Sequence, residues 1–218
     1  MKIIAPSMLS SNFGSLIDEI ELINSSNADW FHLDVMDGVF VPNITFGPPI
    51  IDVFKKFAKK PLDIHLMIVK PENFIDKFSN YKPHTLTIHF EAVKNLKSTL
   101  LKIKKLNIKA GLAINPDTPI VDLEPYINEI YMVCLMGVFP GFSGQKFIKN
   151  TIPRLKQLRK LIKNNKSNAL IQIDGGVDLS NVRELASSGA DILVSGSCIF
   201  KSKNPNSIID SLKEESTL

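Results

Sequence analysis

Polar side chains recur at alternate positions of three short apolar segments of the sequence, WFHLDV, LDIHLM and LIQID. This alternation is typical of β-strands, in which every second side chain points to the same face. The polar residues that share such a face are His32, Asp34, Asp63, His65, Gln172 and Asp174. Two histidines and two aspartates that converged from these strands would be unfavourable to bury unpaired, and a divalent cation would offset their charge and desolvation. The pattern therefore predicts a metal centre.

Two imidazoles with two carboxylates suit zinc or iron(II), with manganese or cobalt as alternatives. The other histidines have weaker claims to this site. His89 ends another strand-like segment and has no carboxylate neighbour of matching parity, so we expect a structural or supporting place for it, and His84 is expected at the surface. Cys134 and Cys198 are too few for a disulfide framework or a thiolate metal site and are expected to be small core residues.

Glycine-bearing turns follow three later segments, with the sequences PGFSGQ at 140–145, DGGV at 174–177 and SGS at 195–197. Glycine allows backbone N–H groups to approach an anion closely, and barrel enzymes commonly hold a phosphate in the loops after their last strands. One such turn alone would be an ordinary connection. Three of them beside the metal candidates predict a substrate that carries a phosphate group.

The elements that must position these residues alternate regularly along the chain. Strands are expected at 3–7, 30–35, 62–67, 85–89, 110–114, 130–135, 170–174 and 192–195. Helices are expected at 16–23, 49–58, 72–78, 96–106, 120–126, 152–163, 179–188 and 207–212. Eight βα units in a chain of this length predict an α/β fold, a single (β/α)8 TIM barrel that forms one domain over residues 1–218. An open doubly wound sheet is the rival, but the turn after the first strand, APSMLSSNF, lacks the GxGxxG pattern.

The composition limits the kinds of binding partner that we expect. The chain carries 26 basic and 22 acidic residues, a formal charge of +4, without a dense basic tract, so no nucleic-acid partner is expected. Its apolar runs are strand-sized and its start lacks the features of a signal peptide, so we expect a cytoplasmic protein without a membrane partner.

Longer sequence motifs indicate a protein family. They are APSMLSSNF at 5–13, HLDVMDGVFVPNITFGP at 32–48, DIHLMI at 63–68, PGFSGQKFI at 140–148 and IDGGV at 173–177. Together they resemble the ribulose-phosphate 3-epimerase family along essentially the whole chain. The resemblance implies an isomerase that interconverts D-ribulose 5-phosphate and D-xylulose 5-phosphate at C3, in the pentose phosphate pathway. It also implies a homo-oligomer, dimer or hexamer, with one divalent cation per subunit.

The resemblance also assigns roles to individual residues. The metal ligands implied are His32, Asp34, His65 and Asp174, with Asp34 and Asp174 as the acid/base pair that acts through a cis-enediolate. Substrate contacts are implied for Ser7, His65, Asp174 and a phosphate site formed by Gly141, Phe142, Ser143, Gly144, Gly175, Gly176, Gly196 and Ser197. The side chains implied to line the site above the metal are Met36, Met67 and Met136.

Three positions depart from the family pattern. Phe139 stands where asparagine is usual, Ser143 where glycine is usual, and Gly137 where serine or threonine is usual. Ser143 could donate a hydroxyl to the phosphate or could stiffen its turn, and Phe139 removes an amide. We expect these changes to affect substrate affinity more than reaction type.

Other functions fit part of the pattern. An epimerase of a related ketose phosphate, such as D-allulose 6-phosphate, would use the same metal and carboxylates. A metal-free phosphate-binding barrel isomerase of amino-acid biosynthesis would explain the glycine turns but not the histidines and aspartates. A non-catalytic binding protein would not require the intact ligand set. The apolar loop at 39–48 could cover the site or form a subunit contact.

Overall fold

A sheet of eight parallel strands forms the centre of the computed structural model, which describes residues 2–217. The strands are β1 (Ile3–Pro6), β2 (Phe31–Met36), β3 (Leu62–Met67), β4 (Thr85–His89), β5 (Lys109–Ile114), β6 (Met132–Met136), β7 (Leu170–Asp174) and β8 (Ile192–Ser195). All eight predicted strands are present, and their ends differ from the prediction by two residues at most.

The strands follow one another in chain order around the sheet, and β1 also pairs with β8. The ring closes where Ser7, directly after β1, forms a parallel bridge with His32 of β2. A ring of eight parallel strands with helices outside is the (β/α)8 TIM barrel. The predicted fold class is thus confirmed.

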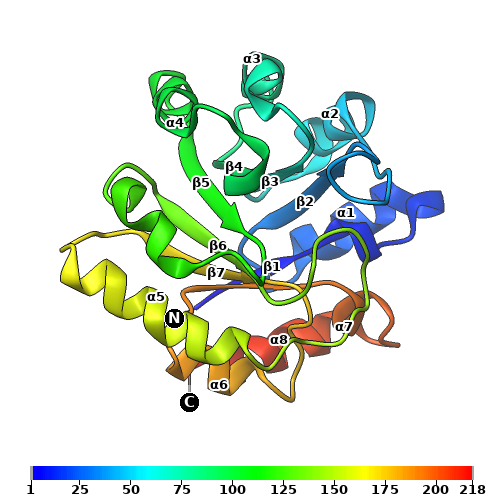
Figure 1. Cartoon of the computed structure of the whole chain (residues 1–218). Coiled ribbons are helices and arrows are strands. Elements are labelled where there is room, and N and C mark those ends of the chain that lie inside the picture. Colours follow the sequence, from blue (N-terminus) through cyan, green and yellow to red (C-terminus); the bar gives the residue numbers. More distant parts are fainter. Residues whose placement is uncertain (1, 218) are drawn as a thin grey trace.

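Helices surround the strands (Figure 1). They are α1 (Leu16–Ser25), α2 (Pro48–Phe57), α3 (Ile75–Ser79), α4 (Leu96–Lys105), α5 (Thr151–Asn164), α6 (Val182–Ser187), α7 (Ser197–Phe200) and α8 (Pro205–Glu215). The segment predicted as a helix at 120–126 is a 3-10 helix, η5 (Ile120–Tyr126), and it contains Pro125, which lacks the N–H that an α-helical ladder needs. The helix predicted at 179–188 is shorter, and α7 was not predicted.

Alternation along each strand sorts its side chains between two environments. Phe31 and Leu33 of β2 and Ile64 and Leu66 of β3 are fully buried in the main core, on the strand face that meets the helices. Full burial of such a side chain contributes about 1.5–3 kcal/mol to folding. This packing fixes the strand register and thereby directs the intervening polar residues into the barrel.

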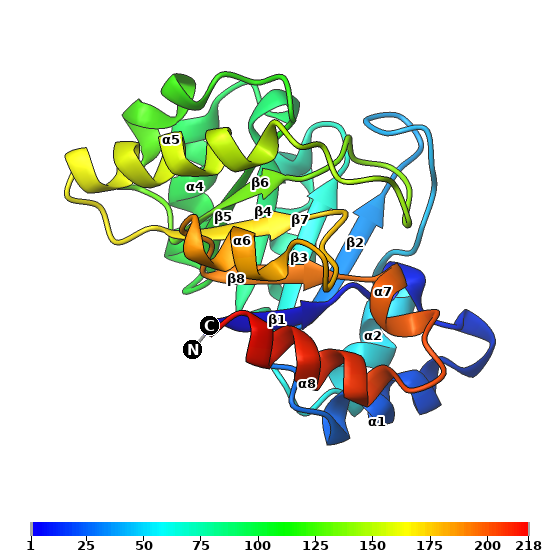
Figure 2. The same cartoon turned by 90° about the horizontal axis from the view of Figure 1, so that it is seen from below.

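The inside of the barrel changes in character along its axis. Apolar side chains gather towards its amino-terminal end, where Trp30, Met132 and Ile192 lie at or just before the starts of their strands and belong to one cluster with Ala5 and Val194. The carboxyl ends of the strands and the loop between β6 and α5 lie at the opposite end from the start of β1 (Figure 2). The functional side chains predicted from the sequence lie towards this carboxyl end. Within residues 2–217, no helix has the length and apolar character needed to span a membrane.

Candidate functional site

Four buried side chains from three strands meet inside the barrel, namely those of His32, Asp34, His65 and Asp174, and one ligand-type atom of each lies within 4.8 Å of the others. His32 Nε2 lies 3.1 Å from Asp34 Oδ1 and 3.5 Å from Asp174 Oδ2. His65 Nδ1 lies 3.4 Å and 3.2 Å from the same two oxygens. Nitrogen and oxygen atoms therefore alternate around a common centre.

A second buried layer holds His32 in its orientation. Its Nδ1 lies 2.7 Å from Asp63 Oδ2, and both side chains are fully buried. Asp63 in turn accepts hydrogen bonds from Gln172 Nε2, at 2.6 Å, and from the Thr85 hydroxyl. A carboxylate behind a histidine fixes its tautomer, and Nε2 of His32 is thereby left to face the cluster.

Asp34 and Asp174 differ in what their second oxygen meets. Asp34 Oδ2 accepts a hydrogen bond of 2.6 Å from the Ser7 hydroxyl. Both carboxylates border the cavity described below, and the Asp174 side chain is the more accessible of the two, at 10% exposed against 5%. The pair is therefore chemically unequal, because only Asp34 is held by a hydroxyl donor.

Charges at the cluster reinforce one another. Burial opposes ionisation of Asp34 and Asp174, but the imidazole of His32, together with that of His65, outweighs it and keeps the pKa of each carboxyl below its usual value. Burial also opposes protonation of His32, yet the carboxylates of Asp34, Asp174 and Asp63 raise its pKa well above its usual value. The histidines therefore favour the ionised form of the carboxylates, and ionised carboxylates supply negative charge that a divalent cation would balance.

The donor set fits such a cation. Imidazole nitrogen and carboxylate oxygen are donors that zinc and iron(II) accept, and the four nitrogen–oxygen separations of the cluster lie between 3.1 and 3.5 Å. His65 Nδ1 is buried and has no hydrogen-bond partner among the described residues, so its lone pair is available to a metal. Cys134, although also buried inside the barrel, has its pKa raised by burial and remains a thiol.

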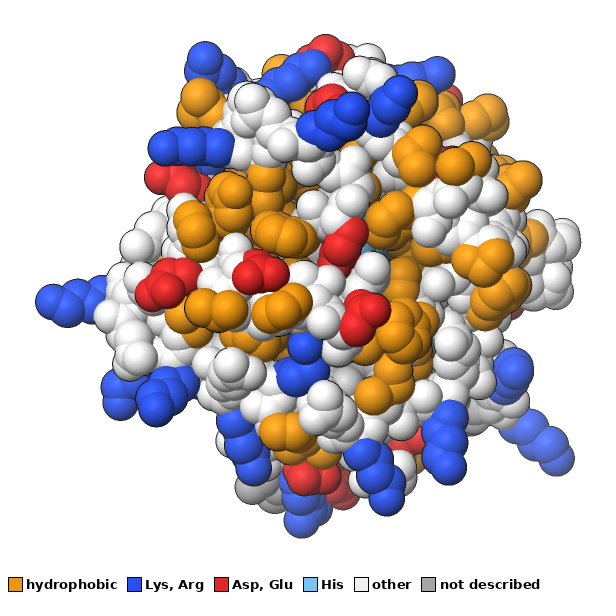
Figure 3. Space-filling view, viewed as in Figure 1, with side chains coloured by type: hydrophobic (Ala, Val, Ile, Leu, Met, Phe, Trp, Pro, Cys, Tyr) orange, Lys and Arg blue, Asp and Glu red, His pale blue; other side chains and the backbone are white. Residues whose placement is uncertain are grey.

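Above the cluster opens a cavity of about 970 Å³. Asp34 and Asp174 reach its floor, whereas His32 and His65 are fully buried and do not line it. The side chains of Met36, Met67 and Met136 border the cavity. On this face of the molecule, hydrophobic side chains gather towards the centre and lysines stand mainly around the rim (Figure 3).

The three glycine turns meet on one wall of the cavity. Gly175 and Gly176 have φ values of +100° and +70°, and a Cβ at Gly176 would lie 2.8 Å from the Phe147 Cα atom. At Gly196 a Cβ would lie 2.4 Å from the Ser10 hydroxyl oxygen. At Gly176 only glycine fits without a shift of the backbone, whereas at Gly196 the contact is with a serine hydroxyl that can rotate. Backbone N–H groups in such turns are typical donors to an anion.

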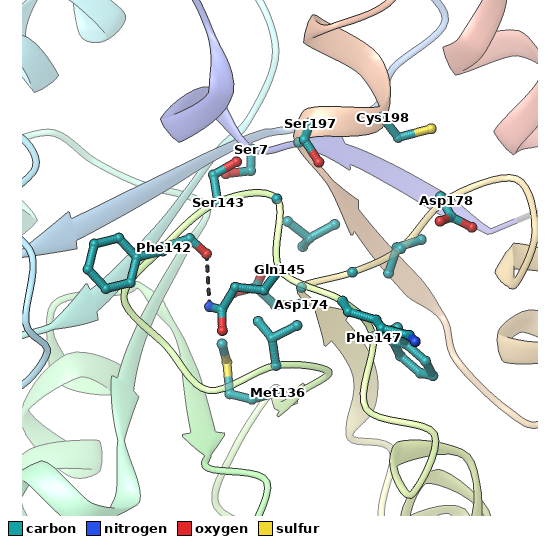
Figure 4. Close-up of a pocket in the computed structure, with 18 of the residues that line it drawn as sticks. Ser7, Met136, Phe142, Ser143, Gln145, Phe147, Asp174, Asp178, Ser197 and Cys198 are labelled. Atoms are coloured by element: carbon teal, nitrogen blue, oxygen red, sulfur yellow. Dashed lines mark hydrogen bonds between the residues drawn. The ribbon is translucent and has the colours of Figure 1, made fainter.

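The loop after β6 extends over the cavity and is fastened at several points. Gln145 Nε2 donates to the carbonyl oxygen of Phe142, at 3.0 Å (Figure 4). It also donates to the carbonyl oxygen of Phe139, at 2.7 Å. The Ser143 hydroxyl lies 2.5 Å from that of Ser10, and Asn43 Nδ2 donates to the Gly141 carbonyl at 2.8 Å. The unusual Ser143 thus links the loop after β6 to the loop after β1.

The other two unusual residues take different places. Phe139 is half-exposed, and its side chain is not among those that border the cavity. At Gly137 a Cβ would lie 2.2 Å from the Gly175 carbonyl oxygen, so the β6 and β7 turns pack too closely here for the usual serine or threonine. This contact accounts for the glycine.

The predicted phosphate residues share the cavity with the predicted acid/base pair. Bordering it are Ser7, Gly141, Phe142, Ser143, Gly144, Gly175, Gly176, Gly196 and Ser197. His84 is half-buried against Trp30 rather than fully at the surface, with ring centroids 4.8 Å apart.

The prediction for His89 was wrong in one respect, since it does have a carboxylate neighbour. Its Nδ1 lies 3.2 Å from Glu91 Oε2. Glu91 lies only two positions after His89, so its parity does match, and it belongs to a 3-10 turn directly after β4. Lys201 was also missed, and it borders the cavity with its Nζ 3.6 Å from where a Cβ of Gly144 would lie.

Comparisons with known proteins identify the family of the chain. The model of the ribulose-phosphate 3 epimerase family matches residues 3–200. A ribulose-phosphate 3-epimerase of Synechocystis is 40% identical over 204 residues, which cover 93% of this chain and 89% of the relative. One of Bacillus subtilis is 38% identical over 211 residues, which cover 96% and 97%.

Solved structures of lower identity share the fold. The crystal structure of KGPDC from Streptococcus mutans superposes with a TM-score of 0.75 at 12% identity and covers 100% of this chain and 98% of that one. That similarity concerns the barrel alone. The family match and the full-length relatives go further, and they establish that the chain belongs to the ribulose-phosphate 3-epimerase family.

Proposed function

We propose that this chain interconverts D-ribulose 5-phosphate and D-xylulose 5-phosphate by moving a proton at C3 between two aspartates beside a divalent metal. Family membership makes the chain an epimerase, which is an enzyme of the isomerase class. The observation that carries the mechanistic proposal is the position of Asp34 and Asp174, each on the cavity floor with an oxygen in reach of both buried histidines. By its substrate and product, the reaction belongs to the pentose phosphate pathway.

Inversion at C3 of a 2-ketose requires removal of a proton next to a carbonyl group and return of a proton to the opposite face. Two acid/base groups must therefore flank the carbon atom. Asp34 projects from β2 and Asp174 from β7, so they approach the cavity from different sides of the ring. In one direction one carboxylate accepts the C3 proton and the other, protonated, donates to the far face of the enediolate, and their roles exchange in the reverse direction.

The residues that would hold the metal are His32, Asp34, His65 and Asp174. A divalent cation bound there would supply Lewis-acid stabilisation of the negative charge that develops on the substrate oxygens. Zinc or iron(II) suits two imidazoles with two carboxylates, and manganese or cobalt remains an alternative. The Ser7 hydroxyl holds the second oxygen of Asp34 and fixes that carboxylate for proton transfer.

The phosphate of the substrate would lie against the glycine wall of the cavity, with Ser143, Ser197 and the backbone of Gly175 and Gly176 as donors. Met36, Met67 and Met136 would exclude water from the reacting carbon atoms.

The loop after β2 bears on assembly. Val39 and Ile44 are 72% and 75% exposed, which is unusual for apolar side chains of this size. We expect a homo-oligomer in which this loop contributes to a subunit contact. Sedimentation of the purified protein tests this, and a monomer at micromolar concentration would contradict it.

Substrate choice is tested by initial rates on D-ribulose 5-phosphate and D-allulose 6-phosphate under the same conditions. We expect a higher kcat/KM for the pentulose phosphate. A preference for the hexulose phosphate would keep the chemistry and change the substrate, whereas inactivity on both would contradict the proposed function.

A further inference from the structure

A row of buried polar side chains continues outward from the metal centre through His65. His65 Nε2 lies 2.9 Å from His89 Nε2, and His89 Nδ1 lies 3.2 Å from Glu91 Oε2. Both imidazole side chains are fully buried, and that of Glu91 is 23% exposed. The proposed reaction uses neither His89 nor Glu91.

The two imidazoles meet edge to edge. Their planes are inclined by only 17°, and their centroids are 5.0 Å apart. This separation exceeds the distance of 2.9 Å between the two Nε2 atoms by almost two ring radii, so the nitrogens lie close to the line that joins the ring centres. That is the geometry of an N–H···N hydrogen bond and not of face-to-face stacking. One of the two nitrogens must donate and the other accept.

Glu91 is held as an acceptor on its far side. Its Oε1 accepts from the backbone N–H of Asn115, at 2.8 Å, and from the Thr118 hydroxyl. Arg154 supports this loop by donating to the carbonyl oxygens of Asn115 and Thr118, at 3.0 and 2.7 Å. The Asn115 N–H can only donate, so an oxygen atom must occupy the Oε1 position.

These contacts determine which atom donates in each hydrogen bond of the row once a metal is bound. A neutral His65 that ligates through Nδ1 carries its proton on Nε2 and donates it to His89 Nε2. His89 then carries its own proton on Nδ1 and donates it to Glu91. Each nitrogen and each oxygen has a role that agrees with its neighbour.

We propose that His89 and Glu91 are positioning residues that hold His65 in the tautomer that binds the metal. This inference rests on the metal centre of the proposed function. His32 is backed directly by a carboxylate, Asp63, whereas His65 reaches its carboxylate through a second histidine. In known metal sites, loss of such a supporting partner lowers metal affinity or activity about 10- to 100-fold.

Glu91→Gln keeps the size of the side chain but should reverse the direction of the hydrogen bonds along the row. Because Asn115 N–H requires an oxygen on one side, the amide nitrogen of the variant must face His89 Nδ1. His89 would then accept at Nδ1 and carry its proton on Nε2, which faces the proton of His65. Two donors would oppose each other across 2.9 Å, and His65 would lose either its position or its ligating tautomer.

Asp191→Asn is the matched control for the change in charge. Asp191 is 27% exposed, pairs with Arg159 and accepts from the Ile171 backbone N–H at 2.8 Å, just before β8. Like Glu91, it is partly buried and accepts from a backbone N–H, but it lies at the other end of the barrel. Zinc affinity is measured by competition with a chelator. We expect a dissociation constant raised about 10- to 100-fold in Glu91→Gln and less than about threefold in Asp191→Asn.

Two neutral variants separate hydrogen bonding from charge. His89→Gln keeps an acceptor for His65 and a donor for Glu91 on one terminal group, whereas His89→Leu keeps neither. We expect His89→Gln to bind zinc within about fivefold of the parent and His89→Leu to resemble Glu91→Gln. Parental affinity in both His89→Leu and Glu91→Gln would overturn the inference, as would an equal loss in Asp191→Asn.

Nitrogen-15 chemical shifts of the zinc-loaded parent give a direct reading. We expect a protonated Nδ1 and an unprotonated Nε2 at His89, and the opposite pattern at His89 would overturn the inference. If the parent itself binds no divalent metal, the metal centre of the proposed function fails. If the parent binds zinc and both Glu91→Gln and His89→Leu bind it equally well, only the positioning role fails.

Discussion

Replacement of either proposed acid/base residue by asparagine tests the separate roles of Asp34 and Asp174 in proton transfer. Asparagine keeps the shape of the side chain and one oxygen towards the cluster, but its nitrogen cannot accept the C3 proton. At Asp34 the new amide would face the Ser7 hydroxyl, which can turn from donor to acceptor, so the local structure should tolerate the change. The loss should therefore be chemical and not structural.

The magnitude follows from the role. A positioned acid or base contributes about 10²- to 10⁴-fold to a rate, or about 3–5 kcal/mol of barrier at 1.36 kcal/mol per decade. We expect Asp34→Asn and Asp174→Asn each to lower kcat for D-ribulose 5-phosphate by that factor when saturated with metal. Asp178→Asn makes the same chemical change at another carboxylate bordering the cavity, which bonds to Ser180, and should lower kcat less than about threefold.

Exchange of the C3 hydrogen in deuterium oxide resolves the two roles. With one aspartate replaced, the remaining aspartate can still exchange the C3 hydrogen of the epimer whose C3 hydrogen points towards it. We expect Asp34→Asn and Asp174→Asn each to retain exchange with only one epimer, and with different epimers, as followed by proton NMR. Near-normal turnover in either metal-loaded variant, or exchange of the same epimer by both, would refute the two-base mechanism.

Two further substitutions test the glycine wall and the loop above it. Gly176→Ala places a methyl group against Phe147 at a residue with φ +70°, so it should destabilise the fold by about 1–3 kcal/mol and raise KM. Thermal unfolding measures the stability and steady-state kinetics measure KM. A variant with the parental Tm and the parental KM would contradict the packing argument. Ser143→Gly removes an exposed hydroxyl contact to Ser10, which is worth about 0.5–1.5 kcal/mol, so KM should rise about 2- to 10-fold. A lower KM in Ser143→Gly would mean that the serine hinders the loop.

Sequence alone could predict most of the site because the barrel repeats one rule. Strand parity placed His32, Asp34, His65 and Asp174 on the inner face, and the ring of parallel strands then brought them together at one end. The apolar residues between them pack against the helices and leave little freedom of register. The same rule placed Asp63 inward, although its role behind His32 depends on distances that parity does not supply.

What the sequence could not predict depends on irregular backbone. Glu91 follows the end of β4 in a 3-10 turn, so strand alternation does not establish its contact with His89, although its position two residues after His89 is visible in the sequence. The contact of Ser10 with Ser143 joins two loops 133 residues apart, and no local pattern encodes such a distance. Gly137 has an explanation only in the neighbouring turn, where the Gly175 carbonyl oxygen occupies the space of a side chain.

The measurement that tests the central claim most directly is the rate of D-xylulose 5-phosphate formation from D-ribulose 5-phosphate by one preparation that is chelator-stripped and then reloaded with zinc, iron(II), manganese or cobalt. The proposed mechanism predicts loss of activity on stripping, by at least about 10²-fold, and recovery with one or more of these cations in proportion to the metal bound, up to one per subunit. Full activity of a preparation verified to be free of metal would contradict it.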